Sequence, residues 1–250
     1  MLQQLRGRRV IEPHPVASEL PADQDLPFVR GLFNSTAPHY DVINRWFSLG
    51  SGAWYRRRCL MRAGLRPGHR IVDVAVGTGL LAQEAVALTG DHGAVLGIDI
   101  SEGMLAIARE KLGIPLIQGT ADALPLAAGV ADFVTMGYAL RHVTNLTVTL
   151  SEFRRVLKRG GKVLLLEVSR PSKVLNRLLA SLFLGEVVPR LSRLTTGEPE
   201  AEALMRYHWQ TMERCVAPEI VMTAMAASGL LDVRCKTDLD LFRSFVGRNP

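Results

Sequence analysis

Cysteine is scarce, with three residues in a chain of 250. Cys59, Cys215 and Cys235 lie far apart, form no CxxC pair and leave an odd count, so neither a disulfide framework nor a zinc cluster is expected. The histidines show no metal-ligand spacing either, and no bound metal is expected. These absences favour a reducing compartment.

Long apolar runs and aromatic residues are also few. No stretch reaches the length of a membrane span, and no apolar signal-peptide core follows Arg6, Arg8 and Arg9. Aromatic residues make up 6% of the chain, which offers few rings for stacking bases, and no RNA-binding motif is present. We therefore expect a cytoplasmic protein, soluble or peripheral at a membrane, with no nucleic acid as partner.

The charge of the chain is unevenly distributed. Lys and Arg number 30 against 24 acids, a net charge of +6, and residues 1–70 account for all of it with eleven Arg and five acids. Four prolines also fall within the first thirty residues and break any helix there. We expect a flexible basic arm over residues 1–30, followed by one domain over 31–250, because 48% hydrophobic composition is ample for a packed core.

Strands and helices alternate from residue 70 onward, after a helical cap over 31–66. This alternation favours a mostly parallel sheet covered on both faces. Residues 171–215 interrupt it with mainly helical sequence. Ser101 is placed to cap the helix that runs through Lys111. Strands are expected over 71–75, 94–100, 116–119, 132–137, 162–168, 231–237 and 241–246, and helices over 80–88, 101–111, 146–156 and 217–228.

The strongest chemical signal is the segment 73–82, DVAVGTGLLA, a glycine turn between a strand and a helix. Such a turn lets a ligand approach the backbone closely. Asp99, twenty residues beyond Gly79, could accept hydrogen bonds from both ribose hydroxyls. A nicotinamide dinucleotide fits this pattern, and so does S-adenosylmethionine. The helical sequence before the turn and Asp73, four residues before Gly77, favour the methyl donor over a pyrophosphate.

Further segments resemble the ubiquinone/menaquinone biosynthesis C-methyltransferase family (UbiE/MenG type), in its order and spacing, from about residue 31 to 235. The opening segment and the Leu-Arg-x-Val segment are more specific than the glycine turn alone. The matching segments are FNSTAPHYDVIN at 33–44, DVAVGTG at 73–79, GIDISEGML at 97–105, ADALP at 121–125, ALRHV at 139–143 and EVSRP at 167–171.

This resemblance implies a Rossmann-like class I methyltransferase fold, an α/β fold with a seven-stranded, mostly parallel sheet and a helical lid over the acceptor. It implies S-adenosyl-L-methionine as cofactor, S-adenosyl-L-homocysteine as product, and methyl transfer to a ring carbon of a prenylated quinol-like acceptor. The implied cofactor residues are Tyr40, Asp73, Ala75, Gly77, Thr78, Gly79, Asp99, Ile100, Met104, Thr120, Ala121 and Gly137.

The candidate catalytic residues follow the fourth expected strand, where doubly wound sheets bind their ligands. They are Tyr138, Arg141 and His142. Arg141 would stabilise a phenolate or position a water, and His142, which can titrate near neutrality, is the better base. His208 with Tyr207 is a second candidate for the acceptor site, against a plain core helix. Glu167 could touch the acceptor or pair with an Arg.

The C-terminal part departs more from the family than the cofactor part, so an O- or N-methyltransferase and a noncatalytic subunit that binds the methyl donor stay open. Residues 173–196 combine leucines with basic residues. They fit a helix on an anionic membrane, and equally a lid or a homodimer contact. The cluster 56–58 of three arginines could meet lipid, RNA or solvent.

Overall fold

The structure is a computed structural model and describes residues 26–213 and 215–250. Most of the expected basic arm therefore lies outside the described residues. Residues 26–30, the last five of that arm, were expected to be irregular. They are helical instead, since they form the first part of α1, which runs from Leu26 to Thr36. Pro27 stands in the first turn of this helix, where a missing N–H breaks no hydrogen bond. The helical cap continues with η1 (Ala37–His39), α2 (Tyr40–Phe47) and α3 (Gly52–Ala63).

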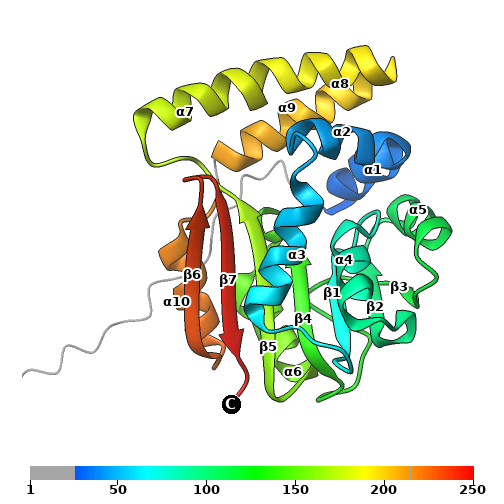
Figure 1. The fold of residues 1–250 in the computed structure, drawn as a ribbon, viewed down its shortest axis with the longest axis vertical. Coiled ribbons are helices and arrows are strands. Elements are labelled where there is room, and N and C mark those ends of the chain that lie inside the picture. The colour runs from blue at the N-terminus through cyan, green and yellow to red at the C-terminus, as the bar shows by residue number, and fades with distance from the viewer. Residues whose placement is uncertain (1–25, 214) are drawn as a thin grey trace, which may run out of the picture.

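The expected seven-stranded sheet is confirmed, with strand order β3-β2-β1-β4-β5-β7-β6. All neighbours pair in parallel except β7, which is antiparallel to both β5 and β6. Figure 1 shows the parallel strands ending below the helices at the top of the molecule. The strands are β1 (Ile71–Val74), β2 (Val95–Asp99), β3 (Leu116–Gln118), β4 (Ala131–Gly137), β5 (Leu157–Val168), β6 (Leu231–Asp238) and β7 (Phe242–Arg248).

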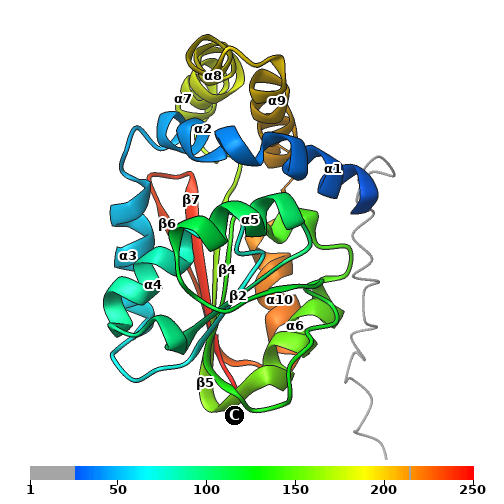
Figure 2. The same cartoon turned by 90° about the vertical axis from the view of Figure 1, so that its right-hand side faces the viewer.

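Each face of the sheet has its own core. Alternate strand residues point to opposite faces, so Ile71 and Leu164 pack with α3 and α4, whereas Val72 and Val163 pack with α6 and α10. Figure 2 shows these two helix layers on either side of the sheet. The covering helices are α4 (Leu80–Thr89), α5 (Glu102–Lys111), α6 (Leu146–Val156) and α10 (Pro218–Ala227).

Local predictions agree with these elements in most places. The hydroxyl of Ser101 accepts a hydrogen bond from the Met104 amide at 3.1 Å, so the predicted cap is confirmed. The strand expected from residue 162 begins earlier, at Leu157, because Leu157 pairs with Ala131 before the register shifts and Lys162 pairs with Phe133.

The insertion over 171–215 is helical, as expected. One continuous helix is formed by α7 (Val174–Ala180), the π-helical η4 (Ser181–Val187) and α8 (Val188–Thr196), and α9 (Pro199–Glu213) packs against it. With α1 and α2, these helices lie over the carboxyl ends of the parallel strands (Figures 1 and 2). No helix within the described ranges is long and apolar enough to cross a bilayer.

Candidate active site

The turn after β1 is held in conformations that favour glycine. Gly77 has φ +57° and Gly79 has φ +89°. A Cβ on Gly79 would lie 2.2 Å from Cδ1 of Leu112, so this glycine is required by packing as well as by backbone. Ala75 adopts φ +55° without being glycine, a costly conformation of the kind that concentrates at functional sites.

Asp99 fastens this turn to the end of β2. Its carboxylate accepts hydrogen bonds from the Gly77 amide at 2.7 Å and the Ser101 amide at 2.8 Å. Burial raises its pKa, and the backbone hydrogen bonds oppose that rise. Each carboxylate oxygen can accept a further hydrogen bond, so these contacts are compatible with ribose hydroxyls.

Asp73 is a buried carboxylate with an unused oxygen. Its Oδ1 accepts a hydrogen bond from the Thr135 hydroxyl at 2.6 Å, and its Oδ2 has no partner among the described residues. Burial raises the pKa of Asp73 to about 7. A cation beside Oδ2 would stabilise the charged form, so this position fits the ammonium group of the expected methyl donor.

Two hollows flank the turn and together contain ten of the twelve expected cofactor residues. We call them the β2 hollow and the β1 hollow, and Ala75 lines both. Gly79 and Met104 line neither hollow, and Met104 is 2% exposed. The β2 hollow also contains Asp99, Ile100, Thr120 and Ala121, and the β1 hollow contains Tyr40, Asp73, Gly77, Thr78 and Gly137.

The N-terminal helices are tied to the turn by residues that sequence reasoning did not single out. Asn34 Oδ1 accepts hydrogen bonds from the Ser101 hydroxyl at 2.6 Å and the Gly103 amide at 3.0 Å. Asp41 accepts one from the Thr78 hydroxyl at 2.5 Å and pairs with Lys111. Both residues belong to the 33–44 segment. Their polar side chains within that motif were the signal that could have pointed to them.

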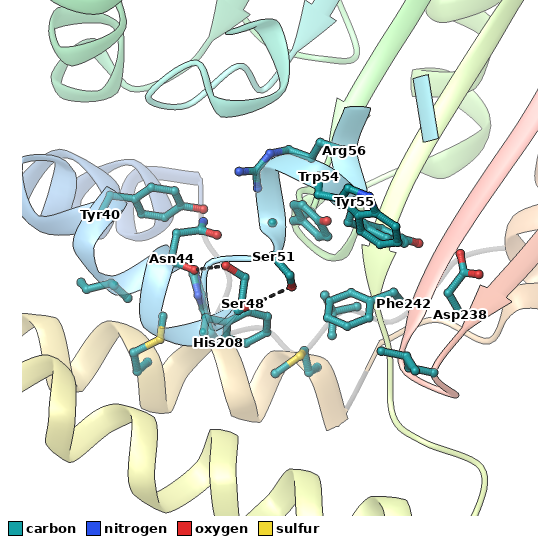
Figure 3. Close-up of a pocket in the computed structure, with 18 of the residues that line it drawn as sticks. Tyr40, Asn44, Ser48, Ser51, Trp54, Tyr55, Arg56, His208, Asp238 and Phe242 are labelled. Carbon is teal, nitrogen blue, oxygen red and sulfur yellow. Dashed lines mark hydrogen bonds between the residues drawn. The ribbon is translucent and has the colours of Figure 1, made fainter. Parts of the chain in front are cut away.

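A larger cavity of about 260 Å³ adjoins the β1 hollow, and we call it the large cavity. Four residues line both spaces and so form the boundary between them: Tyr40, Asn44, Arg56 and Tyr138. Figure 3 shows Tyr40, Asn44 and Arg56 toward one end and Phe242 and Asp238 toward the other. The remaining wall is mostly apolar and includes Ile43, Phe47, Val168, Met205, Met212 and Phe242.

Arg141 lines the large cavity and is held by Glu167. Its Nη1 lies 2.6 Å from Glu167 Oε1, and both side chains are buried. Glu167 also accepts hydrogen bonds from the amides of Arg141, at 3.3 Å, and Val168, at 2.9 Å. Of the two expectations for Glu167, the structure shows pairing with an Arg. The Nε of Arg141 has no partner in the described part of the chain.

His142 was a candidate base, and its surroundings differ from those of Arg141. It lines the β2 hollow rather than the large cavity, and its Nδ1 lies 3.2 Å from the Tyr207 hydroxyl. Burial, with a smaller effect of Arg141, lowers its pKa well below the ordinary value. Tyr138, in the left-handed region at φ +62°, lines the large cavity and the β1 hollow. Burial raises the pKa of Tyr138, so its phenol stays protonated.

His208 on α9 is the histidine that lines the large cavity. It is buried, and its Nε2 has no partner among the residues described. Its ring lies edge-to-face with Tyr40, with centroids 6.3 Å apart. Burial, then Arg141 and His142, lower its pKa well below the ordinary value, so the ring is neutral at pH 7. In the described ranges, no cluster of three or more His, Cys, Asp or Glu could hold a metal ion.

Comparisons with known proteins agree with this geometry. The model of the ubiE/COQ5 methyltransferase family matches residues 21–236. A ubiquinone/menaquinone biosynthesis C-methyltransferase from Shewanella sp. is 35% identical over 187 residues, covering 72% of this chain and 74% of the relative. The enzyme of the same name from Coxiella burnetii is 33% identical over 220 residues, covering 85% and 87%.

Solved structures show the same fold at lower identity. A SAM-dependent methyltransferase from Thermotoga maritima has a TM-score of 0.62 at 20% identity and covers 88% of this chain and 99% of that one. A phosphoethanolamine N-methyltransferase from Haemonchus contortus, in complex with S-adenosyl-L-methionine, has a TM-score of 0.61 at 17% identity and covers 87% and 57%. The expected class I fold is confirmed.

Proposed function

The chain belongs to the ubiE/COQ5 methyltransferase family and is a SAM-dependent methyltransferase, and we propose that it methylates a ring carbon of a quinol with an apolar tail. The observation that carries this proposal is the large cavity. It is apolar along most of its wall, shares a boundary with the β1 hollow and is lined by two buried guanidinium groups, of Arg56 and Arg141, and by the buried neutral imidazole of His208. A flat hydroxylated ring with a hydrocarbon tail matches that combination.

The residues around the turn fit the methyl donor, which supplies an electrophilic methyl group when bound. Asp73 Oδ2 would accept the ammonium group, since it is buried and has no partner within residues 26–213 and 215–250. Asp99 would accept the ribose hydroxyls, and Thr120 and Ala121 would flank the adenine from the β2 hollow. The methyl group would then face the large cavity across Tyr40 and Tyr138.

His208 and Arg141 would act on the acceptor. As a ring carbon forms its bond to the methyl group, the ring hydroxyl becomes strongly acidic, so even a weak base can take its proton. Neutral His208 Nε2 suits that role, and Arg141 would donate a hydrogen bond to the ring oxygen, which becomes a carbonyl acceptor once its proton has left. The ring carbon's own proton leaves afterwards to water and His208 returns its proton to the ring oxygen, which restores the aromatic hydroxylated ring and the neutral imidazole.

A panel of acceptors tests this proposal. The purified enzyme is given labelled methyl donor with a chemically reduced short-tail demethylmenaquinol, a simple phenol, a catechol and a biogenic amine. We expect turnover of the demethylquinol to exceed that of the other acceptors, and Asp73→Asn to lower that turnover when the methyl donor is below saturation. Preferred turnover of the amine, or equal turnover of every phenol, would contradict the proposal.

A further inference from the structure

Helix α7 exposes an apolar face. Four large residues of α7 and one at the start of η4 are each 57–67% exposed, and their spacing places them on one side of the helix. The opposite side of the continuous helix is buried through Leu184 and Val188. The exposed residues are Val174, Leu175, Leu178, Leu179 and Leu182, and we call them the leucine face.

The turn between β6 and β7 carries another exposed leucine in a strained conformation. Leu239 and Asp240 adopt φ +54° and +57°, where a branched, bulky residue is rare. Leu239 is nevertheless 84% exposed and lines the large cavity. A residue that is both exposed and cavity-lining lies at the mouth, so the strain places an apolar side chain at the entrance.

Hydrogen bonds connect this turn to α7. The carboxylate of Asp240 accepts from the Ser172 hydroxyl at 2.6 Å, the Lys173 amide at 3.0 Å and Asn176 Nδ2 at 3.1 Å. Figure 1 shows the tips of β6 and β7 below the N-terminal end of α7. The mouth of the large cavity therefore lies beside the leucine face.

An exposed aromatic side chain also lies at the rim of the large cavity. Trp54 at the start of α3 lines the large cavity and is 60% exposed. The guanidinium of Arg58 lies 5.0 Å from the centre of the Trp54 ring. An indole with an adjacent cation is the pair that binds at the headgroup level of a bilayer.

The charges near the leucine face and the mouth favour an anionic partner. Lys173, Arg177 and Arg58 form no ion pair in the described part of the chain. The neighbouring acids are already used, since Asp238 pairs with Arg62 at 2.8 Å and Asp240 accepts three hydrogen bonds. A second copy of the same surface would bring like charges together.

We infer that the leucine face, Leu239 and Trp54 form a docking surface for an anionic bilayer, which delivers a lipid-tailed acceptor directly into the mouth of the large cavity. This inference rests on the proposed function for the nature of the acceptor. Apolar side chains inserted at headgroup depth, flanked by cations, are the features of a helix that lies on a membrane without crossing it.

Vesicle co-sedimentation tests the surface without any acceptor. Vesicles of phosphatidylglycerol and phosphatidylcholine are compared with phosphatidylcholine alone, using the wild type and the triple variant Leu175→Ser, Leu178→Ser, Leu179→Ser. The control is Leu194→Ser with Ile220→Ser, which changes exposed apolar residues outside the surface. We expect binding to the anionic vesicles to fall by roughly tenfold or more in the triple variant and to stay unchanged in the control.

Two further measurements separate the outcomes. Turnover of a short-tail acceptor in solution should be the same in the triple variant and the wild type, whereas turnover of a long-tail acceptor in vesicles should fall with binding. Leu239→Asn should reduce vesicle binding without loss of thermal stability, because Asn tolerates positive φ better than Leu. Unchanged vesicle binding by the triple variant, or conversion of a dimer to a monomer with no vesicle binding by the wild type, would overturn the inference. Vesicle binding and oligomeric state are both measured without an acceptor, so neither result depends on whether the proposed acceptor is correct.

Discussion

The cofactor turn and the large cavity meet at the same edge of the sheet but are assembled differently. Asp73, Gly77 and Asp99 lie within 27 positions of one another and are joined largely through backbone amides. The large cavity is assembled from α2, α3, α9 and the β6–β7 turn, whose residues span positions 40 to 242. A site made by neighbouring loops leaves a motif in the sequence, whereas a cavity between distant helices depends on tertiary packing.

The two regions also differ in how their charges are balanced. Asp73 is a buried acid whose second oxygen has no partner in the described part of the chain, so on our account a cation of the ligand completes this region. Arg141 is already paired with Glu167 at 2.6 Å, so this positive charge at the large cavity is balanced within the protein before any ligand binds. The difference predicts that changes at Asp73 act mainly on binding, and changes at Arg141 on both folding and turnover.

The largest expected effect comes from breaking the Arg141–Glu167 pair. Arg141→Met leaves the Glu167 carboxylate buried without its ion-pair partner, which should cost about 3–5 kcal/mol of unfolding free energy. Adding Glu167→Met should recover most of that loss in urea unfolding. Turnover should stay low in the double variant, because the donor to the ring oxygen is gone; recovered turnover would show that the pair is only structural.

Replacement of His208 by Phe should keep the shape of the cavity wall while removing Nε2. We expect kcat to fall by roughly 10²-fold, with little change in KM, since the base acts mainly in the transition state. Steady-state kinetics with the demethylquinol measures this, and His142→Phe is the matched comparison outside the large cavity. Equal losses in the two variants would contradict the assignment.

Asp73→Asn should weaken binding of S-adenosyl-L-homocysteine by roughly 30-fold or more, because an ammonium then lacks its buried carboxylate. The fold should survive, since the Thr135 hydroxyl can still donate to an amide oxygen. Calorimetric titration gives the affinity, with Asp132→Asn at a more exposed ion pair as the control. An affinity equal to that of the wild type would remove Asp73 from the site.

Gly79→Ala should destabilise the cofactor turn through packing and backbone together. The added Cβ would lie 2.2 Å from Leu112 at φ +89°, and we expect a loss of about 1–3 kcal/mol. Gly129→Ala has a similar positive φ but no atom within 4 Å of its Cβ, so its loss should be smaller. Thermal melts of both variants measure the difference, and equal melting temperatures would show that the contact with Leu112 relaxes freely.

Within a single pH unit, the smallest predicted effect is a pH dependence of cofactor affinity. Folding raises the pKa of Asp73 from 3.8 to about 7, so the folded protein binds a proton more tightly and its unfolding free energy falls as pH rises through this window. Binding of the ammonium requires the carboxylate, so affinity for S-adenosyl-L-homocysteine should instead rise with pH and level off above about 7, by up to about tenfold per unit. Calorimetry at several pH values should show this rise in the wild type and a flatter profile in Asp73→Asn.

Sequence patterns predicted the sheet and the position of the glycine turn. They also pointed to most of the residues that line the two small hollows, because all of these features depend on short-range spacing. They did not predict that α1 begins at Leu26. Pro27 was counted as a helix breaker, but a proline is compatible with the first turn of a helix. Arg56 appeared as one of three adjacent arginines, and only packing shows that it is buried at the boundary between hollow and cavity. His142 and His208 could not be ranked from sequence, because their exposure to the cavity depends on how α9 packs.

The central claim is that the methyl group crosses from the β1 hollow to a ring carbon in the large cavity. It is tested most directly by transfer from S-adenosyl-L-methionine labelled with ¹³C in the methyl group to short-tail demethylmenaquinol, followed by NMR of the product. The account predicts a single labelled methyl bonded to a ring carbon. A labelled methyl bonded to oxygen, or no labelled product from the quinol, would contradict it.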